Sequence, residues 1–335
     1  MKPTILLICL AICVNVFSQN DTTIIKDTAI VDINDSDIKG PNDAQPLKVF
    51  YDQRLINTNS VEVLHKGVMQ FRVIHNFGDI AGKFGGIKRF FGLDAATDIK
   101  ISFQVGLGER LNILAGRAKG DEAFTGDATF SIGQLRYLWE LGLKYQFMKQ
   151  AENDPKRPFS ITAYINTVVS SMDTAGKTRF KDRAFSSFSD RMSELVQVMI
   201  ARRFGNFSLQ LTPTLVHTAT VFPGESENLF ALGGGIRIPI TKKFFLIADY
   251  THPFRTQQTI DILRSHNIRL YDIFGVGLEV VTEGHVFHMN FTNTTHAIEN
   301  RMIPRTFTSW GEGKYRWGFN ISRNFVLFRD KKGNK

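Results

Sequence analysis

The chain has 335 residues, with 41 lysines and arginines against 32 aspartates and glutamates, which gives a formal net charge of +9 at pH 7. Its two cysteines, Cys9 and Cys13, both lie in an apolar N-terminal stretch, so once this is removed as a signal the chain has neither disulfides nor thiolate metal sites. No second long apolar segment follows, so a membrane-spanning form of the chain cannot be helical and must be a closed barrel.

Residues 1–18 have the features of a secretory signal peptide. Lys2 precedes an apolar run from Ile5 to Val14, and Ser18 supplies a small residue before Gln19. The run is too short to span a bilayer as a helix. We therefore expect export through a cleaved signal peptide and a mature chain that starts near Gln19.

Residues 19–49 form a polar, acidic segment with six aspartates against three lysines. A segment with so little apolar content cannot form a core of its own. We expect it to be a flexible periplasmic tail, followed by a single barrel domain over residues 50–328. The last residues, 329–335, form a charged C-terminal tail after the aromatic Phe328.

About twelve segments between residues 67 and 328 alternate apolar with polar residues, as β-strands with one apolar face do. The longest runs from Leu135 to Phe147, and a strand of this length can cross a membrane at a tilt. The same alternation occurs at 69–73, 159–166 and 287–292. The sequence therefore predicts an all-β fold, a single transmembrane antiparallel up-and-down β-barrel of about 12 strands.

The connections between these segments alternate between short and long, which is typical of an outer-membrane barrel. Short ones lie near residues 106–109, 148–157, 205–206, 241–242 and 281–283, and long ones near 78–97, 118–133, 171–192, 252–269 and 294–313. The connection 218–228 is intermediate in length but falls at a long position. Short turns are periplasmic in such barrels, so an even strand number places both termini there. A soluble β-sandwich would show the same alternation with polar faces outward, but the signal peptide, the strand length and the unequal connections favour the barrel.

Pro213 interrupts the predicted strand 207–217. A proline removes a donor from the hydrogen-bond ladder, and a closed barrel has no free edge to accommodate it. We interpret Pro213 as the end of a strand near the membrane interface.

Three local motifs suggest chemistry without supplying its geometry. His285 and His288 lie on opposite faces of a strand, so they do not form one metal site. Ser265-His266-Asn267 has the residue types of a hydrolase triad, but adjacent residues do not align a nucleophile with its base. Gly233-Gly234-Gly235 lacks the P-loop order of strand, lysine motif and helix, and indicates close packing inside the barrel. We expect no cofactor, no metal and no enzymatic activity.

Several stretches together resemble a known family. They are Phe90 to Asp94, Ile200 to Phe204, Leu209 to His217, Ala231 to Gly235, Gly284 to Asn293, Trp310 to Gly313 and Gly318 to Arg323. The chain after Val61 resembles a family of outer-membrane β-barrel proteins of the Bacteroidota type. The resemblance implies an outer-membrane barrel and supplies no substrate or catalytic residue.

If the apolar faces contact lipid, the charged residues of the polar faces project into the lumen with a basic bias. These candidate lumen-lining residues are Arg72, Arg136, Glu140, Lys144, Arg203, Arg237, Asp249 and Glu279. A basic pore would favour anions. Alternatively, the side chains pair with one another and fill a closed interior, as in narrow barrels.

Two function classes follow from these alternatives, and a third is kept beside them. The first is a passive channel or solute-binding barrel in the cell outer membrane, and the second is a non-conducting structural or interaction barrel of the envelope. An outer-membrane lipid hydrolase is the third. The expected partners are outer-membrane lipid and lipopolysaccharide, the barrel insertion machinery and small anionic solutes, and no nucleic acid.

Overall fold

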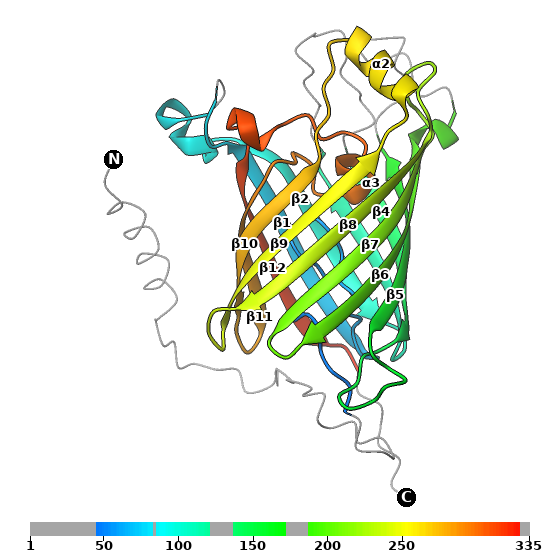
Figure 1. Cartoon of the computed structure of the whole chain (residues 1–335), viewed down its shortest axis with the longest axis vertical. Helices are drawn as coiled ribbons and strands as arrows, with labels where there is room; N and C mark the ends of the chain where they lie inside the picture. Colours follow the sequence, from blue (N-terminus) through cyan, green and yellow to red (C-terminus); the bar gives the residue numbers. More distant parts are fainter. Residues whose placement is uncertain (1–44, 83–84, 121–136, 172–186, 329–335) are drawn as a thin grey trace, which may run out of the picture. The chain divides into compact units, whose positions relative to one another are not determined.

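The described residues form a closed antiparallel β-barrel of 12 strands (Figure 1). The computed structural model describes residues 45–82, 85–120, 137–171 and 187–328. Each strand pairs with its sequence neighbours, and the first strand closes the barrel against the last. The predicted fold class and strand number are therefore confirmed. The strands are β1 (Val68–Asp79), β2 (Ala96–Gly106), β3 (Leu111–Ala118), β4 (Leu138–Met148), β5 (Ser160–Ser170), β6 (Met192–Phe204), β7 (Phe207–Thr218), β8 (Asn228–Pro239), β9 (Phe244–Phe254), β10 (Ile273–Val281), β11 (His285–Thr292) and β12 (Arg316–Val326).

The period-two alternation of the sequence sorts side chains between the outside and the inside of the barrel. On β4, Leu141 is 59% exposed and points outward, whereas Glu140 and Lys144 are buried inside. The same division holds on β1, where Arg72 is buried between outward-facing apolar residues. Outward apolar side chains and inward polar ones are the arrangement of a barrel placed in lipid.

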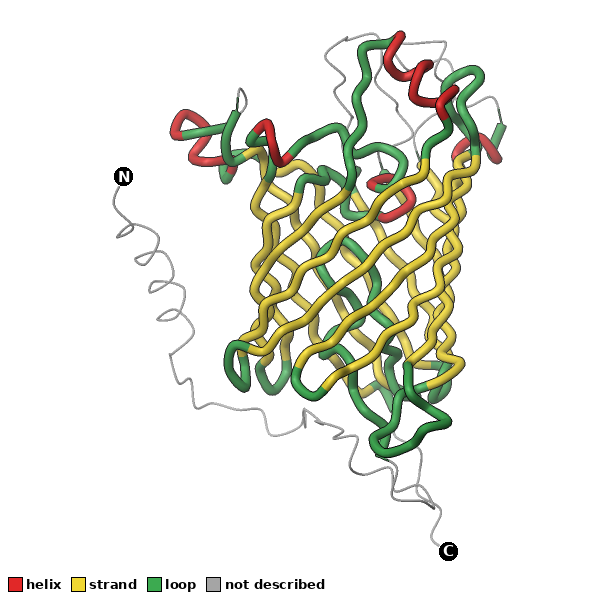
Figure 2. The backbone as a smooth tube through the Cα atoms, viewed as in Figure 1, coloured by secondary structure: helices red, strands yellow, loops and turns green. Residues whose placement is uncertain are grey.

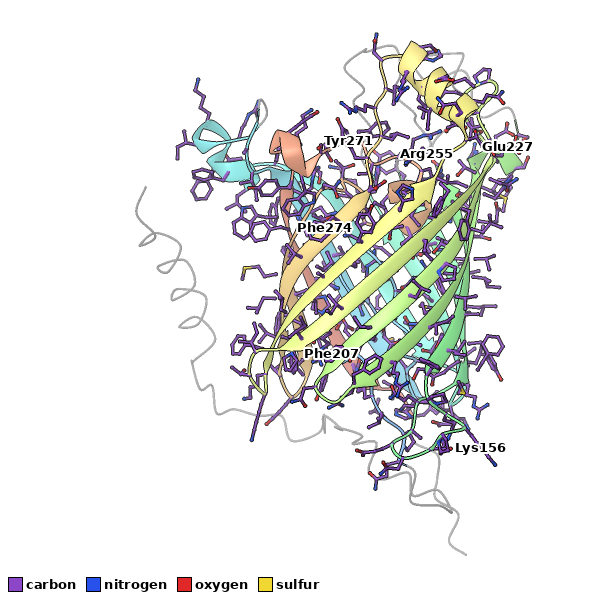
Figure 3. All side chains as sticks on the ribbon, viewed as in Figure 1. Lys156, Phe207, Glu227, Arg255, Tyr271 and Phe274 are labelled. Carbon is purple, nitrogen blue, oxygen red and sulfur yellow. The ribbon has the colours of Figure 1, made fainter. Side chains whose placement is uncertain are left out.

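The two ends of the barrel differ in the length of their connections. Lys156 and Phe207 lie at the end with short connections, which we call the turn end, and Glu227 and Tyr271 lie at the other, the loop end (Figure 3). The loop end carries the short helices η2 (Ile87–Gly92), η5 (Ser189–Arg191), α2 (Gln257–Ser265), α3 (Glu299–Met302) and η6 (Trp310–Glu312). No helix among the described residues has the length and apolar character needed to cross a bilayer.

Pro213 lies in the middle of β7, so the interpretation of this proline as a strand end is wrong. On one side it pairs with Leu232 of β8. On the other side, the pairing of β7 with β6 is interrupted between Thr214 and Leu211. The missing N–H donor therefore leaves a local gap in the β6–β7 ladder, and the residue pairs on either side of the gap hold the two strands together.

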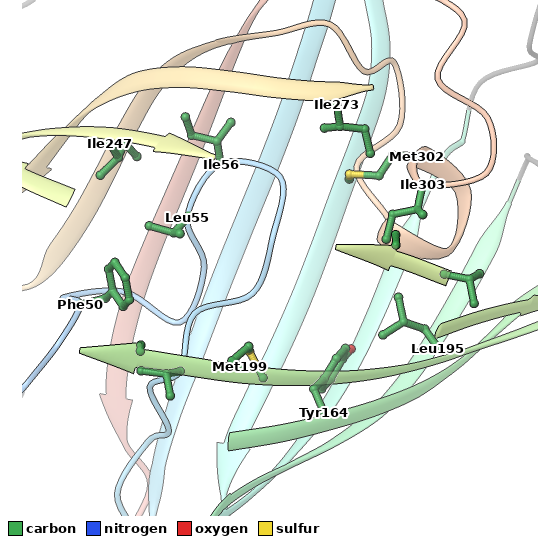
Figure 4. Packing of buried hydrophobic residues seen from close by; sticks show 14 of the residues in the cluster. Phe50, Leu55, Ile56, Tyr164, Leu195, Met199, Ile247, Ile273, Met302 and Ile303 are labelled. Atoms are coloured by element: carbon green, nitrogen blue, oxygen red, sulfur yellow. The ribbon is translucent and has the colours of Figure 1, made fainter. Parts of the chain in front are cut away.

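Two segments that are not part of the wall fill the lumen. Residues 45–66 enter from the turn end and return to it before β1, and residues 293–306 fold inward from the loop end between β11 and β12. Figure 2 shows loop segments inside the ring of strands. Apolar residues of both segments belong to one buried cluster, in which Leu55 and Ile56 come from the first and Met302 from the second (Figure 4). The core of the protein thus lies in the lumen.

The described residues include most of the predicted barrel domain and the last residues of the predicted N-terminal tail. Residues 50–66, predicted as part of the barrel domain, lie inside the barrel and not in its wall. Residues 46 and 47 pair with the connection between β4 and β5 at the turn end. The predicted signal peptide, residues 19–44 of the predicted tail and the C-terminal tail 329–335 lie outside the described residues.

Candidate functional site

Residues 49–64 form a hairpin within the lumen, which we call the central hairpin. Its two arms are joined by backbone bonds from Ser60 N to Gln53 O (2.9 Å) and from Leu55 N to Thr58 O (2.9 Å). At its base, the Glu62 carboxylate accepts hydrogen bonds from the backbone N–H groups of residues 49 and 50, at 2.7 and 3.0 Å. The hairpin is therefore held together by its own hydrogen bonds as well as by the wall.

The tip of the central hairpin is bound by Asp249 of β9. One carboxylate oxygen, Oδ2, accepts the backbone N–H groups of Ile56, Asn57 and Thr58 at 3.0, 2.6 and 3.1 Å. The other oxygen accepts the Asn57 side-chain amide at 2.8 Å. Hydrogen bonds to a charged acceptor are stronger than those between neutral groups, so Asp249 fixes the depth to which the hairpin enters.

The first arm of the hairpin is held by Arg72 of β1. The guanidinium donates to both carboxylate oxygens of Asp52, from Nη2 at 2.5 Å and from Nη1 at 2.7 Å. Gln70 and Ser322 donate to the same carboxylate. Burial by itself raises the pKa of Asp52, but the Arg72 charge and its hydrogen bonds outweigh burial and lower this pKa to about 2. Asp52 therefore stays ionised, and it neutralises an inward-facing arginine.

Glycines in the wall make room for the hairpin tip. A Cβ atom at Gly235 would lie 2.2 Å from Cδ1 of Leu55, and one at Gly275 would lie 2.5 Å from Nδ2 of Asn57. Both glycines belong to neighbours of β9, on β8 and β10. The Gly233-Gly234-Gly235 motif thus has a structural explanation, because the hairpin occupies the space that a side chain at 235 would need.

The inward-folded residues 293–306, which we call the inward loop, meet the hairpin through Glu299. Its two carboxylate oxygens accept the backbone N–H and the side-chain amide of Asn59, at 2.9 and 2.8 Å. Arg54 Nη1 lies 3.7 Å from Glu299 Oε1. The two segments therefore form one continuous filling that connects the turn end to the loop end.

Most of the candidate lumen-lining residues lie inside the barrel and have partners there. Glu140 pairs with Lys100, and Arg237 pairs with Glu279 at 2.5 Å. The Lys144 ammonium lies 3.4 Å from the backbone oxygen of Gln53 on the hairpin. Together with Arg72 and Asp249, these residues fill the interior by pairing with each other and with the hairpin.

The other two candidates are placed differently. Arg203 is half-buried near the turn end, where its side chain donates to the backbone oxygens of Gly205 and Lys48. Arg136 lies outside the described residues. Sequence patterns did not reveal Asp52 and Glu299, because both lie in segments without strand periodicity. Lys100 was also missed, although it occupies a polar position on β2.

The serine and histidine of the hydrolase motif are close together but are not aligned for catalysis. Ser265 Oγ lies 3.2 Å from His266 Nδ1, and both atoms lie within 2.8 Å of the Ile262 carbonyl oxygen. A carbonyl oxygen only accepts, so Nδ1 must carry a proton. It cannot then take the proton of the serine, as a general base would.

The two histidines of the His285/His288 motif lie on opposite faces of β11. His288 is buried and lies 3.2 Å from Glu279, whereas His285 points to the other side of β11 and is partly exposed. The described residues contain no group of three or more metal-ligating side chains that would suit a metal ion.

A small pocket lies at the loop end. It is lined among others by Arg255, Thr259 and Arg305 and has a volume of about 30 Å³. This is room for one or two water molecules. A solute of the size of a sugar or an amino acid does not fit into it.

The described fold is similar to several solved porins and channels, all at low sequence identity. For the KdgM porin the identity is 8% and the TM-score 0.41, over 78% of this chain and 99% of that chain. For an outer membrane channel from Pseudomonas putida F1 the identity is 12% and the TM-score 0.45, over 79% of this chain and 98% of that chain. For the channel DcaP of Acinetobacter baumannii they are 9% and 0.33, over 77% and 96%. No curated protein matches the chain.

A family model supplies the classification. The model described as a membrane bound beta barrel domain, DUF5777, matches residues 50–325. This range covers the inward loop, the central hairpin except Val49, and the twelve strands except Val326 at the end of β12. The chain therefore belongs to this family of membrane-bound β-barrel domains.

Proposed function

We propose that the protein is an outer-membrane channel for small anionic solutes, closed in the described conformation by the central hairpin, which acts as its gate. The observation that carries the proposal is the hairpin itself. It fills the lumen without contributing a strand to the wall, and polar groups hold it at both its tip and its first arm. Withdrawal of the hairpin would leave the closed sheet intact.

The charges support an anionic solute. The hairpin contributes Asp52 and Glu62, which interact electrostatically with Lys144, and Asp52 also pairs with Arg72. Withdrawal would uncover these two basic side chains together with two carboxylates, those of Asp249 and Glu299. It would also remove the hairpin's own charges, which are Asp52 and Glu62 against Arg54. The open lumen would therefore be more positive than the filled one by one charge, which favours anions.

Conductance in a planar bilayer tests the proposal. The wild type should be closed most of the time, and deletion of residues 21–64 should give a folded barrel with steady conductance. Its anion preference should weaken as salt rises and the Debye length falls from about 10 Å at 0.1 M. Deletion of residues 21–44, which keeps the hairpin, is the matched control and should stay closed. A folded and inserted 21–64 deletion that is silent, or that prefers cations, would overturn the proposal.

A non-conducting interaction barrel is the second candidate, and one contact favours it. Asn59 and Glu299 link the hairpin to the inward loop, so the lumen is filled from both ends. Under this alternative the hairpin is a permanent part of the core. Loss of heat-modifiable migration in the 21–64 deletion, together with its retention in the 21–44 deletion, would show that the hairpin is needed for the fold and would favour this second candidate.

A further inference from the structure

Arg301 is a buried arginine that has no counterion within hydrogen-bond distance among the described residues. It lies on α3, at the loop end inside the barrel (Figure 1), and is 2% exposed. Its Nε and Nη2 atoms have no hydrogen-bond partner within the described part of the chain. Glu194 acts on it electrostatically, but without a hydrogen bond to these atoms.

Two other arginines in this part of the barrel, Arg305 and Arg316, are neutralised by carboxylates, whereas Arg301 is not. Arg305 makes a bidentate pair with Glu225, with both N–O distances at 2.6 Å. Arg316 donates from Nη2 to Asp79 at 2.7 Å. Burying a charge is unfavourable unless the charge is paired. Among the described residues, no carboxylate is within hydrogen-bond distance of the Arg301 guanidinium to balance its positive charge.

His296, on the same inward loop, offers a second donor. It is 1% exposed, and neither ring nitrogen has a hydrogen-bond partner within the described residues. The charges of Arg301 and Arg316 both act on it. Burial lowers the pKa of His296 to about 3, and the two arginines lower it in the same direction, so the ring is neutral and carries one N–H.

We propose that Arg301 binds a small monovalent anion, such as chloride, inside the loop end of the barrel, with the His296 N–H as a second donor. A monovalent ion matches the one positive charge of Arg301. A halide suits an enclosed site because it accepts hydrogen bonds from several directions. The site lies on the inward loop and not on the central hairpin, so it is independent of whether the hairpin opens.

Bromide is a suitable probe, because it replaces chloride and gives an anomalous diffraction signal. Crystals of the wild-type protein grown in bromide should show an anomalous peak within hydrogen-bond distance of the Arg301 guanidinium. A well-ordered Arg301 with water and no anomalous peak beside it would overturn the proposal, without any variant being made.

Thermal unfolding of the detergent-solubilised protein gives a second readout. At constant ionic strength, the unfolding midpoint of the wild type should rise when gluconate is replaced by bromide. Arg301→Gln should weaken the apparent bromide affinity at least about tenfold. Arg264→Gln removes an exposed arginine from the last turn of α2 and is the matched control, which should respond like the wild type. An unchanged bromide response in folded Arg301→Gln would contradict the assignment.

Discussion

At the scale of single residues, buried charges determine how the lumen is filled. Each of the strongest ion pairs joins a wall residue to a partner inside the barrel or on another strand. They are Arg72 with Asp52, Lys100 with Glu140, and Arg237 with Glu279. Removing one partner of such a pair leaves an uncompensated buried charge, which costs about 3–5 kcal/mol. Only the pair of Arg72 with Asp52 includes the hairpin, so this pair helps to fix the position of the hairpin, whereas the other two pairs join wall strands.

The Asp52 pair predicts a pH dependence of stability. The pKa of Asp52 is lowered from 3.8 to about 2. A carboxyl group whose folded pKa is lowered stabilises the fold above its unfolded pKa and loses this contribution as the pH falls through the folded pKa. At pH 7, Asp52→Asn should therefore lower the free energy of unfolding by at least about 2 kcal/mol. The difference from the wild type should shrink between about pH 4 and pH 2.

Urea unfolding in lipid vesicles, followed by tryptophan fluorescence, measures this difference. Asp154→Asn is the control, because Asp154 forms its ion pair with Arg157 in an exposed turn. Its effect on unfolding should be small at every pH. A difference between wild type and Asp52→Asn that grows as the pH falls would contradict the assignment of the pair.

At the scale of elements, the central hairpin depends on wall positions that lack a side chain. Gly235 faces inward against Leu55, whereas the adjacent Gly234 faces outward. A Cβ atom at Gly234 would have its closest neighbour at 3.4 Å, which is an ordinary contact. Two neighbouring glycines on one strand therefore have different roles, because only one of them faces the hairpin.

This difference predicts opposite results for two similar substitutions. Gly235→Val should displace the hairpin tip, because the new side chain would occupy the position of Leu55. The variant should show a higher probability of channel opening and faster proteolysis within residues 50–60. Gly234→Val should behave like the wild type in both assays, since its side chain would face lipid. Equal behaviour of the two variants would mean that the hairpin is not held at this position.

At the scale of the whole molecule, the strands separate an apolar outer surface from a lumen that is filled by polar pairs and by an apolar cluster. Apolar side chains form its outer surface, with Trp139, Leu141 and Phe147 of β4 each more than half exposed. The hairpin and the inward loop fill the lumen and bury the inward-facing side chains of the strands. Stability in the membrane therefore depends on the outer apolar band and on the polar pairing inside.

The apolar outer surface predicts that the cost in stability of a charge placed there depends on its depth in the membrane. Leu141→Arg, near the middle of β4, should cost about 2–4 kcal/mol of barrel stability, because it places a charge in hydrocarbon. Leu107→Arg, in the turn between β2 and β3, should cost about 0–1 kcal/mol, because this position is near the interface. Unfolding in lipid vesicles measures both values. Equal costs at the two positions would contradict the membrane-facing assignment of β4.

The sequence by itself determined the barrel, its approximate number of strands and the outward and inward faces of the strands with clear alternation. These properties follow from local patterns, because alternation with a period of two places every second side chain outside, and connection lengths alternate between the two ends. Period-two alternation alone therefore assigns Leu141 to the outside and Lys144 to the inside. Pro213 was misjudged because a closed ladder tolerates a gap that is bridged by its neighbours.

Only the tertiary structure decided that the lumen is filled. The contacts between Asp249 and the hairpin tip join residues more than 190 positions apart, and Asn59 meets Glu299 across 240 positions. The hairpin and the inward loop lack strand periodicity, and polar segments of this kind look the same in a sequence whether they face water or a buried carboxylate. The choice between an open basic pore and a filled interior therefore depended on long-range charge pairing, which local patterns do not contain.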